Sequence, residues 1–171
     1  MSKNTPHVSK NSGENEWYTP AEYLDAARRV MGKIDLDPAS SFIANSVVLA
    51  TNYYTKEQDG LNQEWYGRVW LNPPYGAGLI NPFAIKLVNS LFNGNVTEAI
   101  VLVNNATETG WFKTLYGASS AVCFPTKRIR CWRVDGDTNS PLQGQAFIYF
   151  GQRAHIFIEE FRKIGLIYVK H

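Results

Sequence analysis

The sequence has few of the residues from which covalent or metal-based frameworks are built. Its 171 residues include only two cysteines, Cys123 and Cys131, with no CxxC pair and no cysteine–histidine cluster. Two cysteines are too few for a disulfide framework, and zinc ligands occur at characteristic spacings that are missing here. We therefore expect reduced thiols in a cytoplasmic protein, and no metal site.

Long hydrophobic runs are lacking as well. No apolar run approaches the ~18–20 residues of a membrane-spanning helix, so we expect no membrane partner. The first residues, "MSKNTPHVSKNSGENE", are polar and do not contain the apolar centre of a signal peptide. We expect residues 1–15 to form a disordered tail, followed by a single domain over residues 16–171.

Charge of either sign is modest overall but uneven locally. Lysine and arginine number 17 against 15 acidic residues, which gives a net charge of +2. The segment "KRIRCWR" (residues 127–133) contains four cations and no acid. Aromatic residues make up 13% of the chain and include five tryptophans, and such rings fill cores or stack on unpaired bases. The local pattern therefore indicates a polyanionic partner more clearly than the net charge does.

Helical and strand patterns alternate along the chain. A helix is expected over residues 19–32, with Thr19 and Glu22 as a capping box and Gly32 as the terminator. Further helices are expected at 80–94, 110–117 and 155–163, and strands at 33–38, 46–54, 68–72, 98–104, 120–125, 144–151 and 164–170. The beginning of segment 46–54 could also be helical. This alternation is typical of an α/β fold with a mostly parallel central sheet and helices on both faces.

Two of the expected strands end in polar chemistry. The first is followed by "DLDPAS" (residues 35–40) and the third by "LNPPYG" (residues 71–76). In parallel α/β sheets, ligands bind beyond the carboxyl ends of the strands. The pattern therefore predicts a site where these two strand ends meet.

The residues Asn72, Pro73, Pro74 and Tyr75 suit chemistry at an exocyclic amine such as adenine N6. The lone pair of that amine is delocalised into the ring and must be localised before it attacks a methyl group. The Asn72 side-chain oxygen and the Pro73 carbonyl can accept the two amino hydrogens, because Pro74 keeps Pro73 extended. Tyr75 can stack on the ring, so catalysis would come from positioning and electrostatics.

Three islands in the same order, Trp17–Pro20, Asp35–Ser40 and Asn72–Gly76, resemble the phage-type DNA N6-adenine methyltransferases, the Dam-like group. The resemblance extends over about residues 16–151. It implies a Rossmann-like methyltransferase fold, S-adenosylmethionine as the methyl donor and a flipped adenine in double-stranded DNA as the acceptor. It assigns Asn72, Pro73, Pro74 and Tyr75 to the target base.

The resemblance assigns a second set of residues to the cofactor: Asp35, Asp37, Pro38, Ala39 and Ser40 in the first loop, with Trp17, Thr19 and Pro20 against the methionine end. Either Asp35 or Asp37 can accept from the cofactor's ammonium group. Asp59 either binds the cofactor's adenine amine or is only the first residue of an Asp-Gly turn. The glycine-rich loop common in methyltransferases is absent from "DLDPASS", although small residues there still permit close approach.

Contacts to DNA are expected from residues of the basic segment, namely Lys127, Arg128, Arg130, Trp132 and Arg133. In an extended chain, Arg128, Arg130 and Trp132 share one face. Arginine binds phosphates or reads guanine with two hydrogen bonds. Too few residues remain for a separate recognition domain, so loops must read a short site, for which the resemblance suggests GATC. We expect a monomer or a weak dimer.

Other functions share parts of this pattern. The same motif suits amino methyltransferases that act on rRNA guanine or on a protein glutamine, and an inactive DNA-binding module would also keep the fold. Cytosine C5 methylation is disfavoured. That reaction uses a cysteine nucleophile that usually follows a proline, and neither cysteine here follows a proline. If the protein is phage-encoded, it would work in the cytoplasm of the bacterial host.

Overall fold

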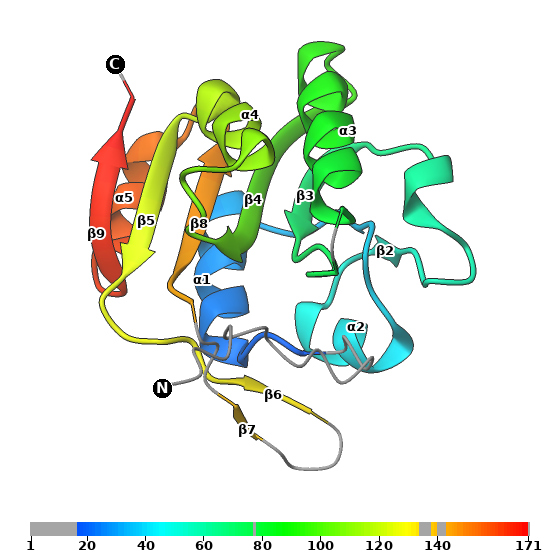
Figure 1. Ribbon diagram of the computed structural model, residues 1–171, viewed down its shortest axis with the longest axis horizontal. Helices are drawn as coiled ribbons and strands as arrows, with labels where there is room; N and C mark the ends of the chain where they lie inside the picture. The colour runs from blue at the N-terminus through cyan, green and yellow to red at the C-terminus, as the bar shows by residue number, and fades with distance from the viewer. Residues whose placement is uncertain (1–16, 77, 134–137, 140–142, 171) are drawn as a thin grey trace, which may run out of the picture.

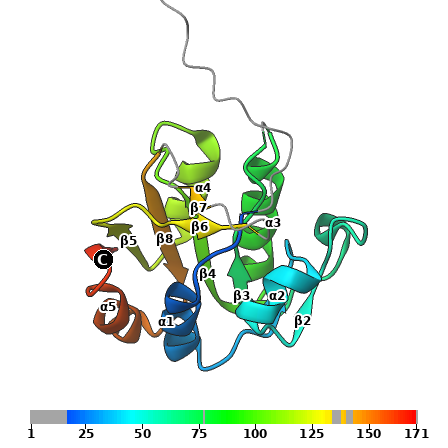
Figure 2. The same ribbon diagram turned by 90° about the horizontal axis from the view of Figure 1, so that it is seen from below.

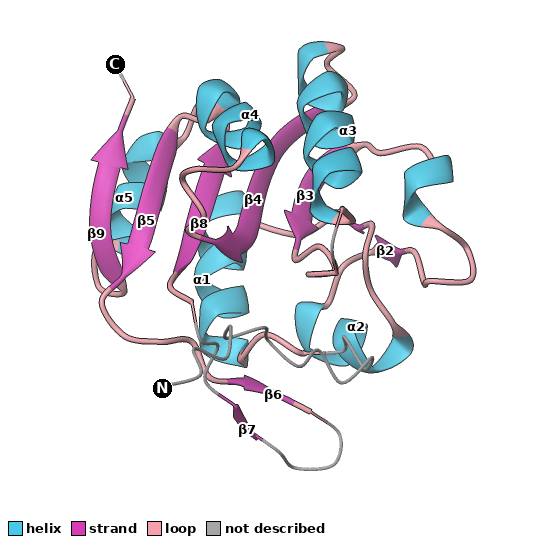
Figure 3. Cartoon of the chain, viewed as in Figure 1, coloured by secondary structure: helices cyan, strands magenta, loops and turns pink. Residues whose placement is uncertain are grey.

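The computed structural model describes all residues except 1–16, 77, 134–137, 140–142 and 171. The described residues form a mixed α/β structure (Figures 1 and 3). Its helices are α1 (Ala21–Met31), α2 (Phe42–Val48), the 3-10 helix η1 (Gly60–Asn62), α3 (Ile80–Phe92), α4 (Gly110–Ala118) and α5 (Ala154–Phe161). Its strands are β1 (Leu36–Asp37), β2 (Asn52–Tyr53), β3 (Gly67–Leu71), β4 (Val96–Asn104), β5 (Ala121–Pro125), β6 (Cys131–Trp132), β7 (Thr138–Asn139), β8 (Gln145–Phe150) and β9 (Gly165–Val169).

Seven of these strands form one sheet in the order β2-β1-β3-β4-β8-β5-β9. The half from β2 to β4 is parallel, as expected. The other half departs from the predicted mostly parallel sheet, because β8 is antiparallel to both β4 and β5, and β9 is antiparallel to β5. The chain leaves β5 through the small β6–β7 hairpin instead of a crossover helix. It therefore re-enters the sheet from the carboxyl edge and must run in the opposite direction.

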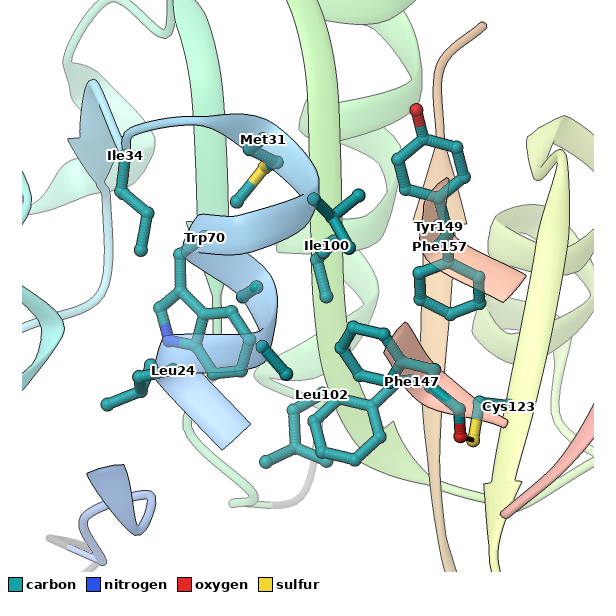
Figure 4. Packing of buried hydrophobic residues seen from close by; sticks show 14 of the residues in the cluster. Leu24, Met31, Ile34, Trp70, Ile100, Leu102, Cys123, Phe147, Tyr149 and Phe157 are labelled. Carbon is teal, nitrogen blue, oxygen red and sulfur yellow. Dashed lines mark hydrogen bonds between the residues drawn. The ribbon is translucent and has the colours of Figure 1, made fainter. Parts of the chain in front are cut away.

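Helices cover both faces of the sheet, as the sequence predicts (Figure 1). Helices α1 and α5 lie on one face, where their apolar side chains pack with Trp70, Leu102 and Phe147 from three strands (Figure 4). Helices α3 and α4 lie on the other face, where Leu87 and Leu115 pack against the opposite side of the same strands. The long apolar run of β4 is explained by this arrangement, since its central residues are buried on both sides.

Residues 42–48 form helix α2, so the first residues of the expected segment 46–54 are helical, which is one of the two conformations that the sequence left open. The Ser41 hydroxyl accepts a hydrogen bond from the Ala44 N–H at 3.1 Å and so caps the helix. The Arg28 side chain on α1 donates to the carbonyls of Val47 and Val48 at the other end. The β-branched residues of this segment are therefore held helical by a cap and by a tertiary contact, and only Asn52–Tyr53 pairs as strand β2.

The capping box predicted at Thr19 is wrong. Helix α1 begins at Ala21, after Pro20, and no side chain caps its first turn. The Thr19 hydroxyl instead accepts a hydrogen bond from the Asn72 side chain. The predicted terminator holds, because Gly32 has the left-handed φ of 81° and its N–H bonds to the Arg28 carbonyl.

Candidate active site

A cavity of about 1000 Å³ opens at the carboxyl ends of β1 and β3. This volume is at the upper end of the ~300–1,000 Å³ typical of small-molecule sites. The predicted site residues that line it are Trp17, Thr19, Asp37, Pro38, Ala39, Ser40, Asp59, Asn72, Pro73, Pro74, Tyr75 and Arg133. The fold thus brings together segments that are more than a hundred residues apart in the chain.

Asn72 follows β3 directly and turns its side chain toward the beginning of α1. Its Nδ2 donates to Thr19 Oγ1 at 3.3 Å, whereas its buried Oδ1 accepts no hydrogen bond. A buried polar atom without a partner is costly, so its presence at a cavity wall is typical of a binding site. The amide is oriented by one partner and leaves its oxygen available as an acceptor.

Tyr75 is held by its hydroxyl group. Its Oη donates to the Leu102 carbonyl on β4 at 3.1 Å, and burial raises the pKa of the phenol strongly. The phenol therefore stays neutral at physiological pH, and its ring is fixed beside the two prolines that form the same cavity wall.

Asp35 and Asp37 lie in different environments although they are two residues apart. Asp37 lines the cavity, is 3% exposed and accepts a hydrogen bond from the Ala39 N–H at 3.2 Å. Burial raises its pKa to about 7, and the Ala39 N–H and the nearby Ser40 side chain only partly oppose this effect. Asp35 does not line the cavity.

The surroundings of Asp35 favour its charged form. Partial burial raises its pKa, but hydrogen bonds and positive charge from Lys33 and Arg68 outweigh burial, so that the net pKa is lowered. Its carboxylate lies 2.6 Å from Lys33 Nζ and 3.3 Å from Arg68 Nε. Of the two carboxylates that the sequence left as alternatives, Asp37 is therefore the one that a ligand in the cavity would meet.

The loop after β1 packs tightly against η1. Gly60 is buried, and a Cβ atom built on it would lie 1.9 Å from the Pro38 carbonyl oxygen. Ser40 Oγ in the same loop is buried without a hydrogen-bond partner. The close backbone approach that a glycine-rich loop usually provides comes here partly from a glycine in another segment.

Asp59 lines the cavity but also has a local structural role. One carboxylate oxygen accepts from the Leu61 N–H at 3.2 Å and the other from Asn62 Nδ2 at 2.7 Å. It has a left-handed φ of 49° and forms the N-cap of η1. Its cavity position and its turn position are therefore compatible, although both oxygens already have donors.

The basic segment joins the N-terminal island instead of standing apart from it. Tyr18 and Trp132 exchange backbone hydrogen bonds of 2.9 and 3.1 Å, and their ring centroids are 4.8 Å apart. The Arg133 guanidinium lies 5.4 Å from the centroid of the Trp17 ring. The hairpin β6–β7 and helix α2 both lie at the carboxyl edge of the sheet (Figure 2), so this segment contributes to the cavity wall.

The remaining predicted DNA contacts lie outside the cavity lining. Lys127, Arg128 and Arg130 are exposed, while Ile129 between them is fully buried. The predicted alternation of this segment therefore holds as far as Trp132, and the polar segment that follows is mostly outside the described residues. Pro20 precedes α1 and does not line the cavity.

Several lining residues were not singled out from the sequence, namely Tyr18, Ser41, Ala44, Val48, Thr55, Lys56, Gly60, Leu61, Trp70, Leu79 and Phe83. The position of Trp70 in the lining could have been predicted from the sequence, because it stands two residues before Asn72 on the same strand face. Lys56 lies shortly after β2 and Leu79 directly precedes α3, and nothing in their local sequence marks them as lining residues.

The part of the chain that the structure describes contains neither a metal-binding cluster nor a membrane-spanning helix. No group of three or more histidine, cysteine or acidic side chains in this part is placed to hold a metal ion. Within the same residues, no helix has the length and apolar character required to cross a bilayer.

Comparison with known proteins identifies the family. No curated protein matches the chain. The model of the family described as DNA N-6-adenine-methyltransferase (Dam) matches residues 6–163, which include the whole cavity lining. The three islands noted in the sequence all lie within this match. The chain therefore belongs to the Dam family of DNA adenine methyltransferases.

Proposed function

We propose that residues 16–171 form a single methyltransferase domain of Rossmann-like fold that methylates the N6 amine of a flipped adenine in a short DNA site, with GATC as the candidate sequence and S-adenosylmethionine as the donor. The observation that carries this proposal is Asn72, whose buried Oδ1 has no partner while its Nδ2 is held by Thr19. The family match supports DNA adenine methylation in general. The parallel strands from β2 to β4, with helices on both faces, support the fold.

The cofactor side of the cavity fits S-adenosylmethionine. This cofactor supplies an activated methyl group when it is bound. The Asp37 carboxylate would accept from its ammonium group, and the unpaired Ser40 hydroxyl is a second polar group available to it. Pro38, Ala39 and Trp17 provide apolar contact on the same wall. The Asp59 carboxylate would accept a hydrogen bond from the cofactor's adenine amine either in addition to its present donors or in exchange for one of them.

The base side acts by orienting an amine. Asn72 Oδ1 and the Pro73 carbonyl would accept the two N6 hydrogens and so favour a nitrogen with a localised lone pair. An amide is not a base at neutral pH, so the contribution of these residues is preorganised positioning and not proton abstraction. The Tyr75 ring would lie against the base, held through its hydroxyl by Leu102.

DNA would approach at the carboxyl edge of the sheet. Lys127, Arg128 and Arg130 are exposed cations that can contact phosphates. Trp132 and Arg133 would connect this surface to the cavity, because they contact Tyr18 and Trp17. With its DNA substrate, the enzyme would act in the cytoplasm, that of the bacterial host if a phage encodes it.

The family match favours DNA adenine over the rRNA guanine and protein glutamine alternatives. The intact residues from Asn72 to Tyr75 disfavour an inactive binding module. The decisive experiment incubates the protein with methyl-labelled S-adenosylmethionine and, separately, DNA duplexes with and without GATC, RNA and protein acceptors. We expect label on adenine N6 of DNA, and label only in RNA or protein would refute the proposal.

The Asn72→Ala variant tests the catalytic assignment. It removes the side-chain acceptor, so we expect a loss of roughly 10²–10³ in kcat, as for other removed electrostatic groups. Cofactor affinity, measured by calorimetry, should change little, because the Asp37 loop is intact. A variant with wild-type turnover would exclude Asn72 from the reaction.

A further inference from the structure

Three buried side-chain atoms among the described residues have no hydrogen-bond partner: Ser40 Oγ, Asn72 Oδ1 and Gln145 Oε1. All three residues lie at the carboxyl edge of the sheet, after β1, after β3 and at the beginning of the reversed strand β8. The first two line the cavity and have roles in the proposed function. Gln145 does not line the cavity and takes no part in the proposed function as described above.

The strand register places Gln145 close to the base side of the site. Gln145 pairs with Asn104, the last residue of β4, and Phe147 pairs with Leu102. Phe147 and Leu102 belong to the same core cluster as Trp70, beneath α1 (Figure 4). Because side chains alternate along strands, Gln145 lies on the sheet face of Phe147, and Asn72 continues the face of Trp70. Gln145 and Asn72 thus share one face at one edge.

Gln145 also contacts Tyr75. The Tyr75 hydroxyl donates to the Leu102 carbonyl at 3.1 Å, and the register of β4 and β8 brings the Gln145 side chain near the same hydroxyl, where it partly opposes the effect of burial on the phenol pKa. The hydroxyl is therefore held from two sides, by β4 and by β8.

Stability does not explain a glutamine at this position. The residue is only 7% exposed, and its Oε1 is buried without a partner, which costs free energy. A leucine of similar size would avoid this cost. Sites that keep a locally unfavourable polar group are commonly those at which the group serves function.

We propose that Gln145 is a positioning residue, which holds the Tyr75 phenol so that its ring lies correctly against the flipped adenine. This inference rests on the proposed function, since it gives Tyr75 the role of contacting the base. It assigns the beginning of β8 to the active site, and it requires the effect of Gln145 to act through the Tyr75 hydroxyl.

A double-mutant cycle tests this requirement with Gln145→Leu, Tyr75→Phe and the combined variant. For Gln145→Leu we expect kcat/KM on duplex DNA to fall about tenfold, with unchanged cofactor affinity and an equal or higher Tm. In the Tyr75→Phe background, which lacks the hydroxyl, we expect the same change to cause less than a twofold further loss. The exposed neighbour Gln143 provides the matched control, and Gln143→Leu should leave kcat/KM unchanged.

A second readout follows base flipping without turnover. With 2-aminopurine at the target position, Gln145→Leu should bind the duplex but give a smaller fluorescence increase than wild type. An equal loss of kcat/KM in both backgrounds, or no loss in either, would overturn the inference. If the wild type methylates DNA and Gln145→Leu behaves like wild type, only this inference fails. If the wild type methylates no DNA, the proposed function itself fails.

Discussion

Asp37 carries a carboxyl group whose pKa is set mainly by burial. Burial raises its pKa from the ordinary 3.8 to about 7, because a charged carboxylate is poorly solvated inside the protein. Asp35 has the opposite net shift, since Lys33 and Arg68 stabilise its charge. A cofactor ammonium group in the cavity would supply to Asp37 the hydrogen bond and positive charge that Lys33 supplies to Asp35.

The raised pKa predicts a pH dependence of stability. Between about pH 4 and about pH 7, Asp37 is protonated in the folded protein and ionised in the unfolded chain. The folded state therefore binds more protons, so the contribution of Asp37 to stability is present below pH 4 and is lost as pH rises through 7. Across this window we expect a loss of up to ~1.4 kcal/mol per pH unit from this group.

Urea unfolding at several pH values measures this contribution. The Asp37→Asn variant cannot ionise, so the difference in unfolding free energy between it and wild type should change with pH across the window. Saturating S-adenosylmethionine should reduce the effect, because its ammonium group would favour the charged carboxylate. A difference that does not vary with pH would show that Asp37 titrates normally.

At the scale of elements, the cavity wall depends on the contact between the loop after β1 and η1. Gly60 allows it, since any side chain would overlap the Pro38 carbonyl oxygen. The Gly60 carbonyl also accepts from Trp65 Nε1 at 2.7 Å, which fixes η1 against the core. The two segments therefore move together if either is displaced.

The Gly60→Ala variant should displace the Pro38 loop and so destabilise the protein by about 1–3 kcal/mol, as overpacking usually does. We also expect weaker cofactor binding, because Pro38 and Ala39 line the cavity. Gly110→Ala is the matched control, as its Cβ would meet no atom within 4 Å. Thermal unfolding measures the stability of both variants, and calorimetry measures their cofactor affinity. Equal values for the two variants would contradict the prediction.

The basic segment from residue 127 to 133 is the element that would contact DNA. Arg130 is exposed on it and lies outside the cavity lining. If it binds a phosphate, Arg130→Ala should lower the slope of log K against log salt concentration by about one unit. Arg162→Ala, an exposed arginine that follows α5, is the control. An unchanged slope for Arg130→Ala in fluorescence anisotropy would place the DNA elsewhere.

For the whole molecule, the two edges of the sheet have different tasks. The carboxyl edge carries the cavity, whereas the amino edge carries a buried polar network. There, the Glu98 carboxylate accepts hydrogen bonds from Tyr149 Oη at 2.7 Å and from the Arg153 guanidinium. Glu98 is 6% exposed, so these donors take the place of water around its carboxylate.

The Arg153→Met variant would leave Glu98 with only one of these two side-chain donors. We expect the protein to lose about 1–3 kcal/mol of stability, which is less than for a fully buried pair because Arg153 is partly exposed. The kcat/KM of the folded enzyme should stay within twofold of wild type, because the cavity is at the opposite edge. A large catalytic loss at full stability would argue against this separation of tasks.

Part of this arrangement could be predicted from the sequence. The turn residue Gly32, the apolar run of β4 and the motif at Asn72 are local signals, and they predicted a helix end, a buried strand and the position of the site. The start of segment 46–54 remained open between strand and helix, because its β-branched residues favour a strand while a serine cap and a contact from Arg28 make it a helix. The register of β8 was not predictable, since strand direction depends on how distant segments pack.

The sequence by itself determined most of the longer helices and strands, which strand ends carry polar motifs and, through its three islands, which family the chain belongs to. These features depend on backbone preferences and on residues that are neighbours in the chain. Only the tertiary structure decided that Asp37 and not Asp35 faces the cavity, that Thr19 orients Asn72 instead of capping a helix, and that Gln145 lies against Tyr75. Burial and hydrogen bonds between distant segments decide these features, and both arise only when the strands are packed into one sheet.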